Sequence, residues 1–412
     1  MTDDLALNAD RIFIVLLAAA VVVALLTERI RVPYTVGLVL LGLAIGLIRP
    51  GSGVAITPGL VLAVLLPALI FEAAFRIDLA ALRPTLVGVL FLAVPGVLIV
   101  ALVVAAVLQA TTGLGFTSAF IVGAIVAATD PAAVIATFKR LRAPDRLATA
   151  VEAESLLNDG TGIVVFTIAL AASTGTGSIP ESVGRFVLVV AGSAVFGAGA
   201  GWLATRLLGL TDDHLLELTM SVVLAYGAYL VADALGGSGI IATTAAGVAL
   251  GSYGRRHGLS PKASESIDLV WEFLAFVGTA LIFLLVGLAI DIEVLGASIV
   301  PIAWAVVAIL LARALVVYVL LGGAARIAGR GGRSLVLPLG WLHVMFWAGL
   351  RGAVSVALVL SLPDDLPDRA LSGAIAFGVV LFTLLVQGST ASFVIRRALA
   401  TTEEPGPILP GG

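Results

Sequence analysis

Long apolar runs separated by short polar loops make up almost the whole chain. A helix needs about 20 mainly apolar residues to cross the hydrocarbon core of a bilayer. Thirteen runs approach or reach that length, two of them short, at 11–27, 33–48, 55–75, 84–108, 114–137, 147–173, 182–205, 214–235, 238–252, 267–290, 295–322, 337–361 and 370–395. The pattern predicts an all-α integral membrane protein with about 13 transmembrane helices, a single unit over 1–397 and a short cytoplasmic tail at 398–412.

Composition agrees with a membrane protein. Of 412 residues, 60% are hydrophobic and 12% charged, and the mean hydropathy is +1.16. A soluble domain has about a quarter of its residues charged. The absence of Cys excludes a disulfide framework and a thiolate metal site, and no cofactor is expected. No basic block suggests nucleic acid as a partner, so the expected surroundings are the lipid bilayer.

The loops predict the orientation. With the N-terminus outside, the cytoplasmic loops hold 17 of the 23 Lys and Arg residues. Four lie outside (Arg11, Arg49, Arg185 and Arg369), and two lie within spans (Arg313 and Arg351). This bias follows the positive-inside rule, and a single missed helix would scramble it. We therefore expect a multi-pass protein of the cell (inner) membrane with its N-terminus outside and its C-terminus cytoplasmic.

A cluster of polar residues interrupts the sixth apolar run. Glu154 and Asn158 are spaced i,i+4 and share one helix face, and Ser155 and Asp159 share the neighbouring face. A carboxylate at bilayer depth costs roughly 2.5–3.5 kcal/mol on insertion scales, so such residues usually mark an ion or proton pathway.

Two other runs are expected to contain broken helices. Pro131 removes an amide donor and disfavours helical geometry at Asp130, and glycines flank Arg351 in Gly349-Leu350-Arg351-Gly352. Freed carbonyls near Thr129, with Asp130, Ser155 and Asp159, would supply hard oxygen ligands, which suit Na⁺, Li⁺ or H⁺. A carboxylate that binds either a proton or a cation, but not both, is the minimum for exchange.

A short internal repeat relates the two halves. Ala68-Leu69-Ile70-Phe71, followed by Ile77-Asp78, resembles Ala280-Leu281-Ile282-Phe283, followed by Ile290-Asp291. The offset is seven spans, and the same offset pairs the two broken helices. Because an odd offset reverses direction in the membrane, we expect inverted repeats with a binding site near the midplane.

Structural readings compete for several of these residues. Arg313 and Arg351 need partners in the membrane, which favours a structural ion pair for Glu154. Asp130, next to a proline, is alternatively a helix cap. Two buried arginines cannot neutralise every acid, so Asp159 is the strongest candidate for the ion site. Glu72 either lines an access path or sits near the inner interface.

Four strings resemble the cation/proton antiporter superfamily, in its NhaP-like and animal sodium/proton exchanger branch. They are ATDPAAV at 128–134, ESLLNDGTGIV at 154–164, LAR at 311–313 and GLRGAVSVAL at 349–358, in family order. The resemblance covers essentially the whole membrane unit. It implies an antiporter that exchanges Na⁺ or Li⁺ for H⁺, by a fold with two unwound crossing helices, in pH and sodium homeostasis.

The resemblance also implies residue roles. Asp159 is the carboxylate that alternately takes a proton or Na⁺, with Asp130, Ser155 and the Thr129 backbone as further ion ligands. Glu154 and Arg313 are the buried ion pair that supports the site, with Asn158 bonded to it and Arg351 at the second unwound helix. Electrogenic relatives have Asp where this chain has Asn158, which implies electroneutral 1:1 exchange.

The family architecture implies a homodimer. The dimerisation domain would span about 11–80 and 214–290, the core domain about 84–173 and 295–396, and a linker helix 182–205. The core would carry Asp159 across the membrane by alternating access, neutralised by H⁺ or Na⁺. The long cytoplasmic regulatory domain of animal exchangers has no counterpart, so regulation by a soluble domain is not expected.

Three alternatives stay open. A K⁺/H⁺ antiporter of the same fold is one, because residue types do not fix a cation radius. An intramembrane aspartyl protease would use Asp130 and Asp159, although it needs a glycine-rich loop before its second Asp. A cation channel would need a continuous polar lining, whereas these residues cluster at one depth. We expect a transporter rather than an enzyme.

Overall fold

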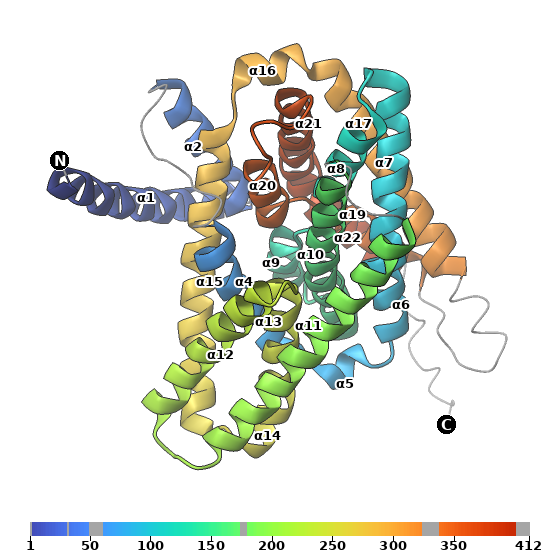
Figure 1. Cartoon of the computed structure of the whole chain (residues 1–412). Helices are drawn as coiled ribbons and strands as arrows, with labels where there is room; N and C mark the ends of the chain where they lie inside the picture. Colours follow the sequence, from blue (N-terminus) through green and yellow to red (C-terminus); the bar gives the residue numbers. More distant parts are fainter. Residues whose placement is uncertain (1, 31–32, 49–60, 174–178, 324–337, 401–412) are drawn as a thin grey trace, which may run out of the picture.

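The computed structural model describes residues 2–30, 33–48, 61–173, 179–323 and 338–400, which form helices and their connections (Figure 1). The helices up to residue 173 are α1 (Thr2–Ile30), α2 (Tyr34–Ile48), η1 (Val61–Leu65), α4 (Leu66–Arg76), α5 (Leu79–Leu82), α6 (Leu86–Phe91), η2 (Leu92–Gly96), α7 (Val97–Thr112), α8 (Phe116–Ala127), α9 (Ala132–Leu141) and α10 (Asp145–Ser173).

The remaining helices follow after residue 178. They are α11 (Ile179–Leu208), α12 (His214–Ala234), α13 (Gly239–Ala249), η3 (Leu250–Gly254), α14 (Arg255–His257), α15 (Pro261–Ala289), α16 (Ile292–Ala297), α17 (Ile299–Ala314), η4 (Leu315–Leu321), α19 (Leu339–Trp347), α20 (Ala353–Leu360), α21 (Arg369–Phe382), η5 (Thr383–Gly388) and α22 (Ser389–Ala400).

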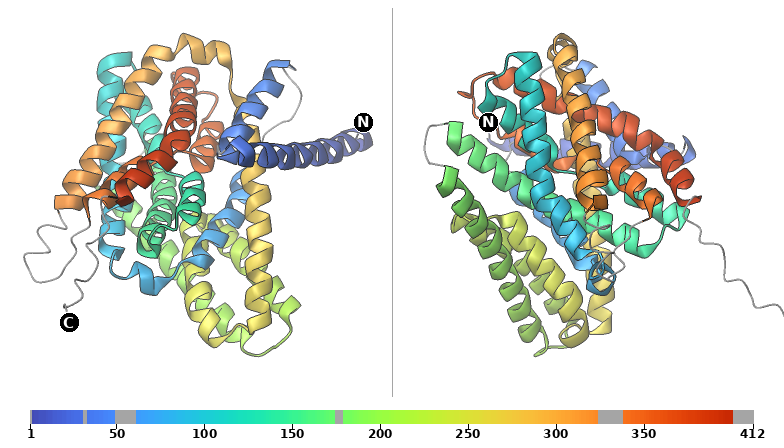
Figure 2. Two further views of the ribbon diagram at one scale, coloured as in Figure 1. Left: turned by 180° about the vertical axis from the view of Figure 1, so that it is seen from behind. Right: turned by 90° about the vertical axis from the view of Figure 1, so that its right-hand side faces the viewer.

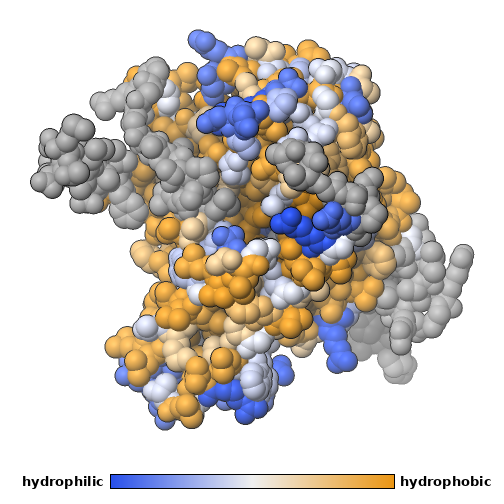
Figure 3. Space-filling view, in the orientation of Figure 1, coloured by the Kyte–Doolittle hydropathy of each residue, from blue (hydrophilic) through white to orange (hydrophobic). Residues whose placement is uncertain are grey.

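The described part of the chain contains eight helical segments long and apolar enough to cross a bilayer, and two shorter apolar ones at Ile14–Thr27 and Tyr34–Ile48. Apolar residues cover most of the face seen in Figure 3. Large side chains such as Leu188 and Val195 on α11 are exposed. Because water would disfavour such a surface, the helices are those of a multi-pass membrane protein.

The two repeated Ile-Asp pairs adopt the same local structure. Ile77 and Ile290 each end a helix in extended conformation, with φ, ψ of −61°, 121° and −77°, 119°. The Asp that follows each caps a short helix: Asp78 Oδ1 accepts from the Ala80 amide at 2.8 Å, and Asp291 Oδ1 accepts from the Glu293 amide at 2.9 Å. The short helices α5 and α16 lie at opposite ends of the molecule (Figure 1). The matching segments therefore run in opposite directions.

Small residues allow the closest helix crossings. A Cβ on Gly42 of α2 would lie 2.1 Å from the Leu284 carbonyl oxygen of α15, and a Cβ on Gly287 would lie 2.1 Å from the Val39 oxygen. Backbones approach this closely only where both helices lack side chains at the contact, as is common in membrane proteins. The α2–α15 pair is thus held in a fixed register.

Two hydrophobic clusters organise the packing. One joins α4, α11, α12, α13 and α15 around the fully buried Trp271 and Phe71. The larger one runs through α7, α8, α10, α17 and α19–α22 and extends to α2 and α4. In this region α7 and α17 run side by side (Figure 2). Helix α1 projects from the body of the protein (Figure 1).

The observed bounds differ from the predicted runs in detail. The short helices α5, α14 and α16 were not predicted, because three to six residues show no hydrophobic periodicity. Residues 398–400, which we expected in the tail, continue α22. Residues 401–412, 55–60 of the third run and the loop arginines at 31, 49, 326, 330 and 333 lie outside the described residues.

Candidate functional site

Two helices are interrupted where the sequence contains Pro131 and the Gly349–Gly352 stretch. Helix α8 ends at Ala127 and α9 begins at Ala132, while α19 ends at Trp347 and α20 begins at Ala353. The two interruptions meet, because the Asp130 amide donates to the Leu350 carbonyl at 2.8 Å. Backbone groups freed in one break are thereby partly satisfied by the other, as buried polar groups require.

Asp130 lies at the N-terminal ends of two helices. Its Oδ1 accepts from the Ala132 amide of α9 at 3.0 Å, and its Oδ2 is 3.4 Å from the Ala353 amide of α20. The N-terminus of a helix carries partial positive charge, which a carboxylate stabilises. Asp130 therefore has the capping role that the sequence left as an alternative, and it faces the same space as the other site residues.

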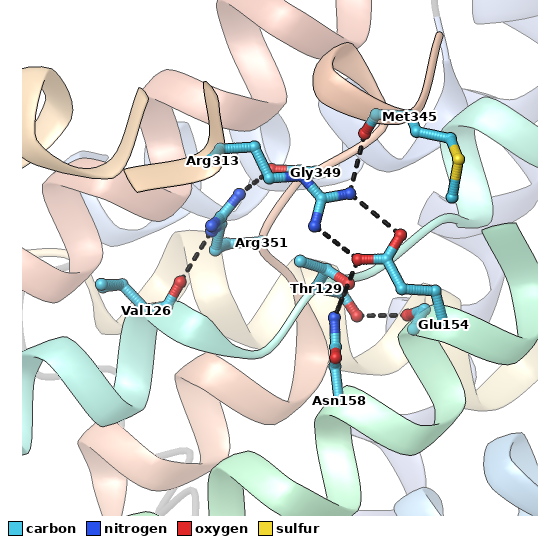
Figure 4. Close-up of polar contacts among 9 residues, drawn as sticks. Val126, Thr129, Glu154, Asn158, Arg313, Met345, Gly349 and Arg351 are labelled. Carbon is cyan, nitrogen blue, oxygen red and sulfur yellow. Dashed lines mark hydrogen bonds and ion pairs between the residues drawn. The ribbon is translucent and has the colours of Figure 1, made fainter. Parts of the chain in front are cut away.

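Arg351 lies at the C-terminal ends of the other two half-helices, α8 and α19, where it supplies positive charge. Its Nε donates to the Val126 carbonyl of α8 at 2.7 Å, and its Nη1 donates to the Gly349 carbonyl after α19 (Figure 4). Its own amide donates to Thr383 Oγ1 at 3.1 Å. Since C-terminal carbonyls carry partial negative charge, this buried guanidinium neutralises both helix ends. The crossing is thus charge-compensated at all four half-helix ends.

A buried ion pair lies beside the crossing. Arg313 of α17 donates to both carboxylate oxygens of Glu154 on α10, with the Nη2–Oε2 distance at 2.9 Å (Figure 4). The same Nη2 donates to the Met345 carbonyl of α19 at 2.7 Å. Glu154 is 1% and Arg313 5% exposed. This bidentate contact ties α10 to α17 and to the end of α19.

Asn158 and Ser155 connect this ion pair to the first break. The Asn158 amide nitrogen donates to Glu154 Oε1 at 3.1 Å and to Thr129 Oγ1 at 3.3 Å. The Ser155 hydroxyl donates to the Thr129 carbonyl. The Thr129 carbonyl oxygen, the expected backbone ligand, therefore already accepts one hydrogen bond. Its second lone pair remains available for an ion.

Asp159 is different from the other acids of the site. Its Oδ1 is buried and has no hydrogen-bond partner within the described residues. It lines a cavity of about 390 Å³ together with Thr129, Asp130 and Ser155. A carboxylate oxygen without a partner in an apolar environment needs a proton or a cation. The structure therefore brings the four predicted ion ligands to one cavity.

Charged residues surround the open end of the cavity. Arg76 Nε lies 2.7 Å from Glu72 Oε1 and Arg76 Nη2 lies 3.0 Å from Glu272 Oε2, both on the side formed by α4 and α15. Lys139 of α9 and Glu152 of α10 also line the cavity and interact electrostatically with Glu72. Glu72 thus lines the same cavity as Asp159, and its role on an access path stays a prediction.

Some cavity residues were not found from the sequence. Tyr34, Thr279, Glu272 and Lys139 all line this cavity together with Asp130. Thr279 had a usable signal, because it is an isolated polar residue in the apolar run 267–290. Tyr34 had none, since an aromatic residue at the start of a span is usually an interfacial anchor.

Comparison with known proteins agrees with this geometry. The pattern of the family described as "Sodium/hydrogen exchanger, transmembrane" matches residues 15–397. The low-affinity Na⁺/H⁺ antiporter NhaS1 of Synechocystis is 35% identical over 402 residues, covering 95% of this chain and 75% of that protein. The Na⁺/H⁺ antiporter ApNhaP of Aphanothece halophytica is 35% identical over 418 residues, covering 96% and 77%.

A solved structure shares the fold. The sodium proton antiporter MjNhaP1 of Methanocaldococcus jannaschii, at pH 8, matches with a TM-score of 0.77 and 22% identity, covering 97% of this chain and 100% of that one. Family membership excludes the intramembrane protease, because these proteins are transporters and not enzymes. The match along nearly the whole chain, with the crossed broken helices and the acidic cavity, shows that the protein belongs to the transmembrane sodium/hydrogen exchanger family.

Proposed function

We propose that the protein exchanges Na⁺ or Li⁺ for H⁺ across the membrane, one for one, with Asp159 as the carboxylate that both ions share. The observation that carries the proposal is the buried Oδ1 of Asp159, which has no hydrogen-bond partner within the described residues and lines a cavity with Thr129, Asp130 and Ser155. Glu154 is engaged by Arg313, and Asp130 by two backbone amides. Asp159 is the acid left to bind a transported ion.

The charges of the site support a stoichiometry of one to one. The site contains two guanidinium groups, Arg313 and Arg351, and three carboxylates, Glu154, Asp130 and Asp159. When all are ionised, the site carries one net negative charge, which is unfavourable at bilayer depth. One proton or one monovalent cation restores neutrality. Each loaded form then crosses without net charge, so the exchange is electroneutral.

Asn158 supports the same stoichiometry from its hydrogen bonds. It precedes Asp159 in the sequence, and its side-chain amide donates to Glu154. An ionised carboxylate in place of Asn158 would instead repel the Glu154 carboxylate. The site therefore has one titrating carboxylate at this depth of α10 rather than two adjacent ones.

We propose alternating access as the transport mechanism. The core domain (about 84–173 and 295–396) moves against a scaffold (about 11–80 and 214–290), with a linker helix at 182–205. Two separate cavities along α15 support this division. The larger one reaches Asp159 past Glu272 and Thr279, and a second of about 280 Å³ lies at the other end of α15, beside Ala289 and Ile290. Only the first contains the site acids.

The wider architecture follows from the same proposal. Thirteen spans, arranged as inverted repeats with two unwound crossing helices, account for the opposed Ile-Asp caps. An external N-terminus in the cell (inner) membrane places Arg76 and Lys139 on the cytoplasmic side, so the larger cavity opens to the cytoplasm. In this proposal the scaffold also forms the interface of a homodimer.

The identity of the cation rests on the relatives. The relatives NhaS1 and ApNhaP are named as Na⁺/H⁺ antiporters. Carboxylate, hydroxyl and carbonyl oxygens suit any hard alkali cation, so K⁺/H⁺ exchange by the same site is the second candidate.

Proteoliposomes with an internal pH-sensitive dye test the proposal. Each alkali chloride is added in turn, with the membrane potential held at zero or at an imposed negative value. Na⁺ and Li⁺ should alkalinise or acidify the lumen according to their gradient, at a rate that does not change with potential. A rate that follows the potential would contradict one-for-one exchange, and a response to K⁺ alone would favour the second candidate.

A further inference from the structure

Two hydroxyl groups face the site from the scaffold side of the cavity. Tyr34 is the first residue of α2 and Thr279 lies in the middle of α15, and both line the cavity that reaches Asp159. The Tyr34 side chain interacts with that of Thr279 at this point of the cavity wall. The Tyr34 ring stacks on Phe276, with centroids 5.7 Å apart and planes 27° apart. The pair is therefore held in one place by the α2–α15 crossing.

The pair lies at an intermediate depth. Phe276, Thr279 and Phe283 follow one another on the cavity face of α15, and their exposed fractions fall from 37% to 8% to 1%. Glu272, one turn before Phe276, is at the exposed end. Thr279 is thus the last polar side chain on this face before the wall becomes apolar at Phe283.

The Tyr34 hydroxyl also interacts electrostatically with two acids of the same cavity. They are Glu72, near the charged open end, and Asp130, at the crossing of the broken helices. A cation that moves through this cavity from its charged open end to Asp159 moves along a wall that includes Tyr34 and Thr279. Dehydration of a small cation is expensive, and an oxygen ligand from the wall offsets part of it.

We propose that the Tyr34–Thr279 hydroxyl pair is a cation-binding station on the scaffold, which coordinates a partly hydrated Na⁺ or Li⁺ before it reaches Asp159. The inference rests on the proposed function and extends it to residues outside the core domain. Because the pair belongs to the scaffold, it stays behind when the core carries the ion across. It therefore acts on cations that enter from this cavity and not on those that enter from the opposite side.

A purely structural role makes a different prediction. If the pair only anchors α2 to α15, loss of a hydroxyl lowers thermal stability and slows transport equally for ions from either side. Tyr34→Phe keeps the ring on Phe276 and removes only the hydroxyl. Thr279→Val keeps the side-chain shape, and Thr279→Ser keeps the hydroxyl.

The test measures the KM for Na⁺ separately from each side, in inside-out and right-side-out vesicles of the full-length protein. For Tyr34→Phe and Thr279→Val we expect a rise of roughly fivefold in KM from the cavity side, the size of one lost neutral ligand contact, with the opposite KM and the maximal rate unchanged. Thr279→Ser should restore the wild-type value.

The matched control is Tyr226→Phe. Tyr226 is another scaffold tyrosine, whose hydroxyl donates to the Val64 carbonyl at 2.9 Å and does not line the cavity. It should leave both KM values unchanged. The proposed station would be wrong if the KM for Na⁺ changed equally from both sides, or if Tyr34→Phe left the KM from the cavity side unchanged. Failure of the proposed function is distinguishable, because the wild-type protein would then show no sodium-driven proton movement at all.

Discussion

The amide of Asp130 donates a hydrogen bond to the carbonyl of Leu350 at 2.8 Å, and this contact joins the two broken helices at their interruptions. At the same crossing, the Asp130 side chain leaves no space for a Cβ atom on Gly352. A Cβ at that position would lie 2.0 Å from Asp130 Oδ2 and 2.6 Å from its Cγ. The Asp130 carboxylate is therefore fixed by backbone contact from the other half of the protein.

Gly352→Ala tests the importance of this close approach. The added methyl group displaces the Asp130 carboxylate from the ends of α9 and α20, so we expect the exchange rate to fall at least about tenfold, a loss of about 1.4 kcal/mol at the site. The rate is measured by sodium-driven pH change in proteoliposomes. Gly373→Ala, where the nearest atom is an ordinary 3.6 Å away, serves as the control and should keep its activity.

We expect the Glu154–Arg313 pair to contribute mainly to the stability of the fold rather than to ion binding. Removing one partner leaves an uncompensated buried charge, which costs about 3–5 kcal/mol. Glu154→Gln and Arg313→Met should each lower the Tm of the purified protein sharply. The double variant removes both charges and should melt above either single variant. If the Tm of the double variant fell by the sum of the two single-variant decreases, the two side chains would not be coupled.

Asn158→Asp examines why the residue beside Asp159 is an amide. An ionised carboxylate there would face Glu154 Oε1 at the distance where Asn158 now donates, 3.1 Å. We expect slower exchange at neutral pH, with partial recovery in acid, where the introduced carboxyl is protonated and donates as the amide does. Initial rates across a pH series provide the measurement. A variant that becomes fully active and potential-dependent would mean that the adjacent charge is tolerated and transported.

Competition at Asp159 sets the pH dependence. Protons and Na⁺ bind the same carboxylate, so the apparent KM for Na⁺ should rise as pH falls, approaching about tenfold per pH unit once protons occupy the site. At high pH the return step lacks protons and the maximal rate should fall instead. Sodium titrations at several pH values, equal on both sides, separate the two effects. A KM independent of pH would point to separate binding sites.

Local rules predicted much of this molecule from its sequence. The apolar runs located the long helices of the described residues, and Pro131 and the glycines around Arg351 indicated both interruptions. Asp78 and Asp291 were recognisable as a repeated pair, although not as caps of helices too short to show a period. These features depend on neighbouring residues only.

Tertiary contacts were harder to predict. Chemistry alone left Glu154 free to pair with Arg313 or Arg351, because both are buried bases in apolar runs. The structure distinguishes them: Arg313 binds the carboxylate and Arg351 binds helix-end carbonyls. The apposition of Tyr34 and Thr279 likewise depends on the crossing of α2 and α15, which no single segment encodes.

Asp159→Asn in proteoliposomes tests directly whether Na⁺ and H⁺ share one carboxylate. An amide can neither release a proton nor neutralise a cation, and it keeps nearly the same size. With an imposed Na⁺ gradient, we expect no sodium-driven pH change and no proton-driven ²²Na⁺ uptake, in a variant that retains the wild-type Tm. Sodium-driven pH change that persists in this variant would contradict the assignment of Asp159 as the shared carboxylate.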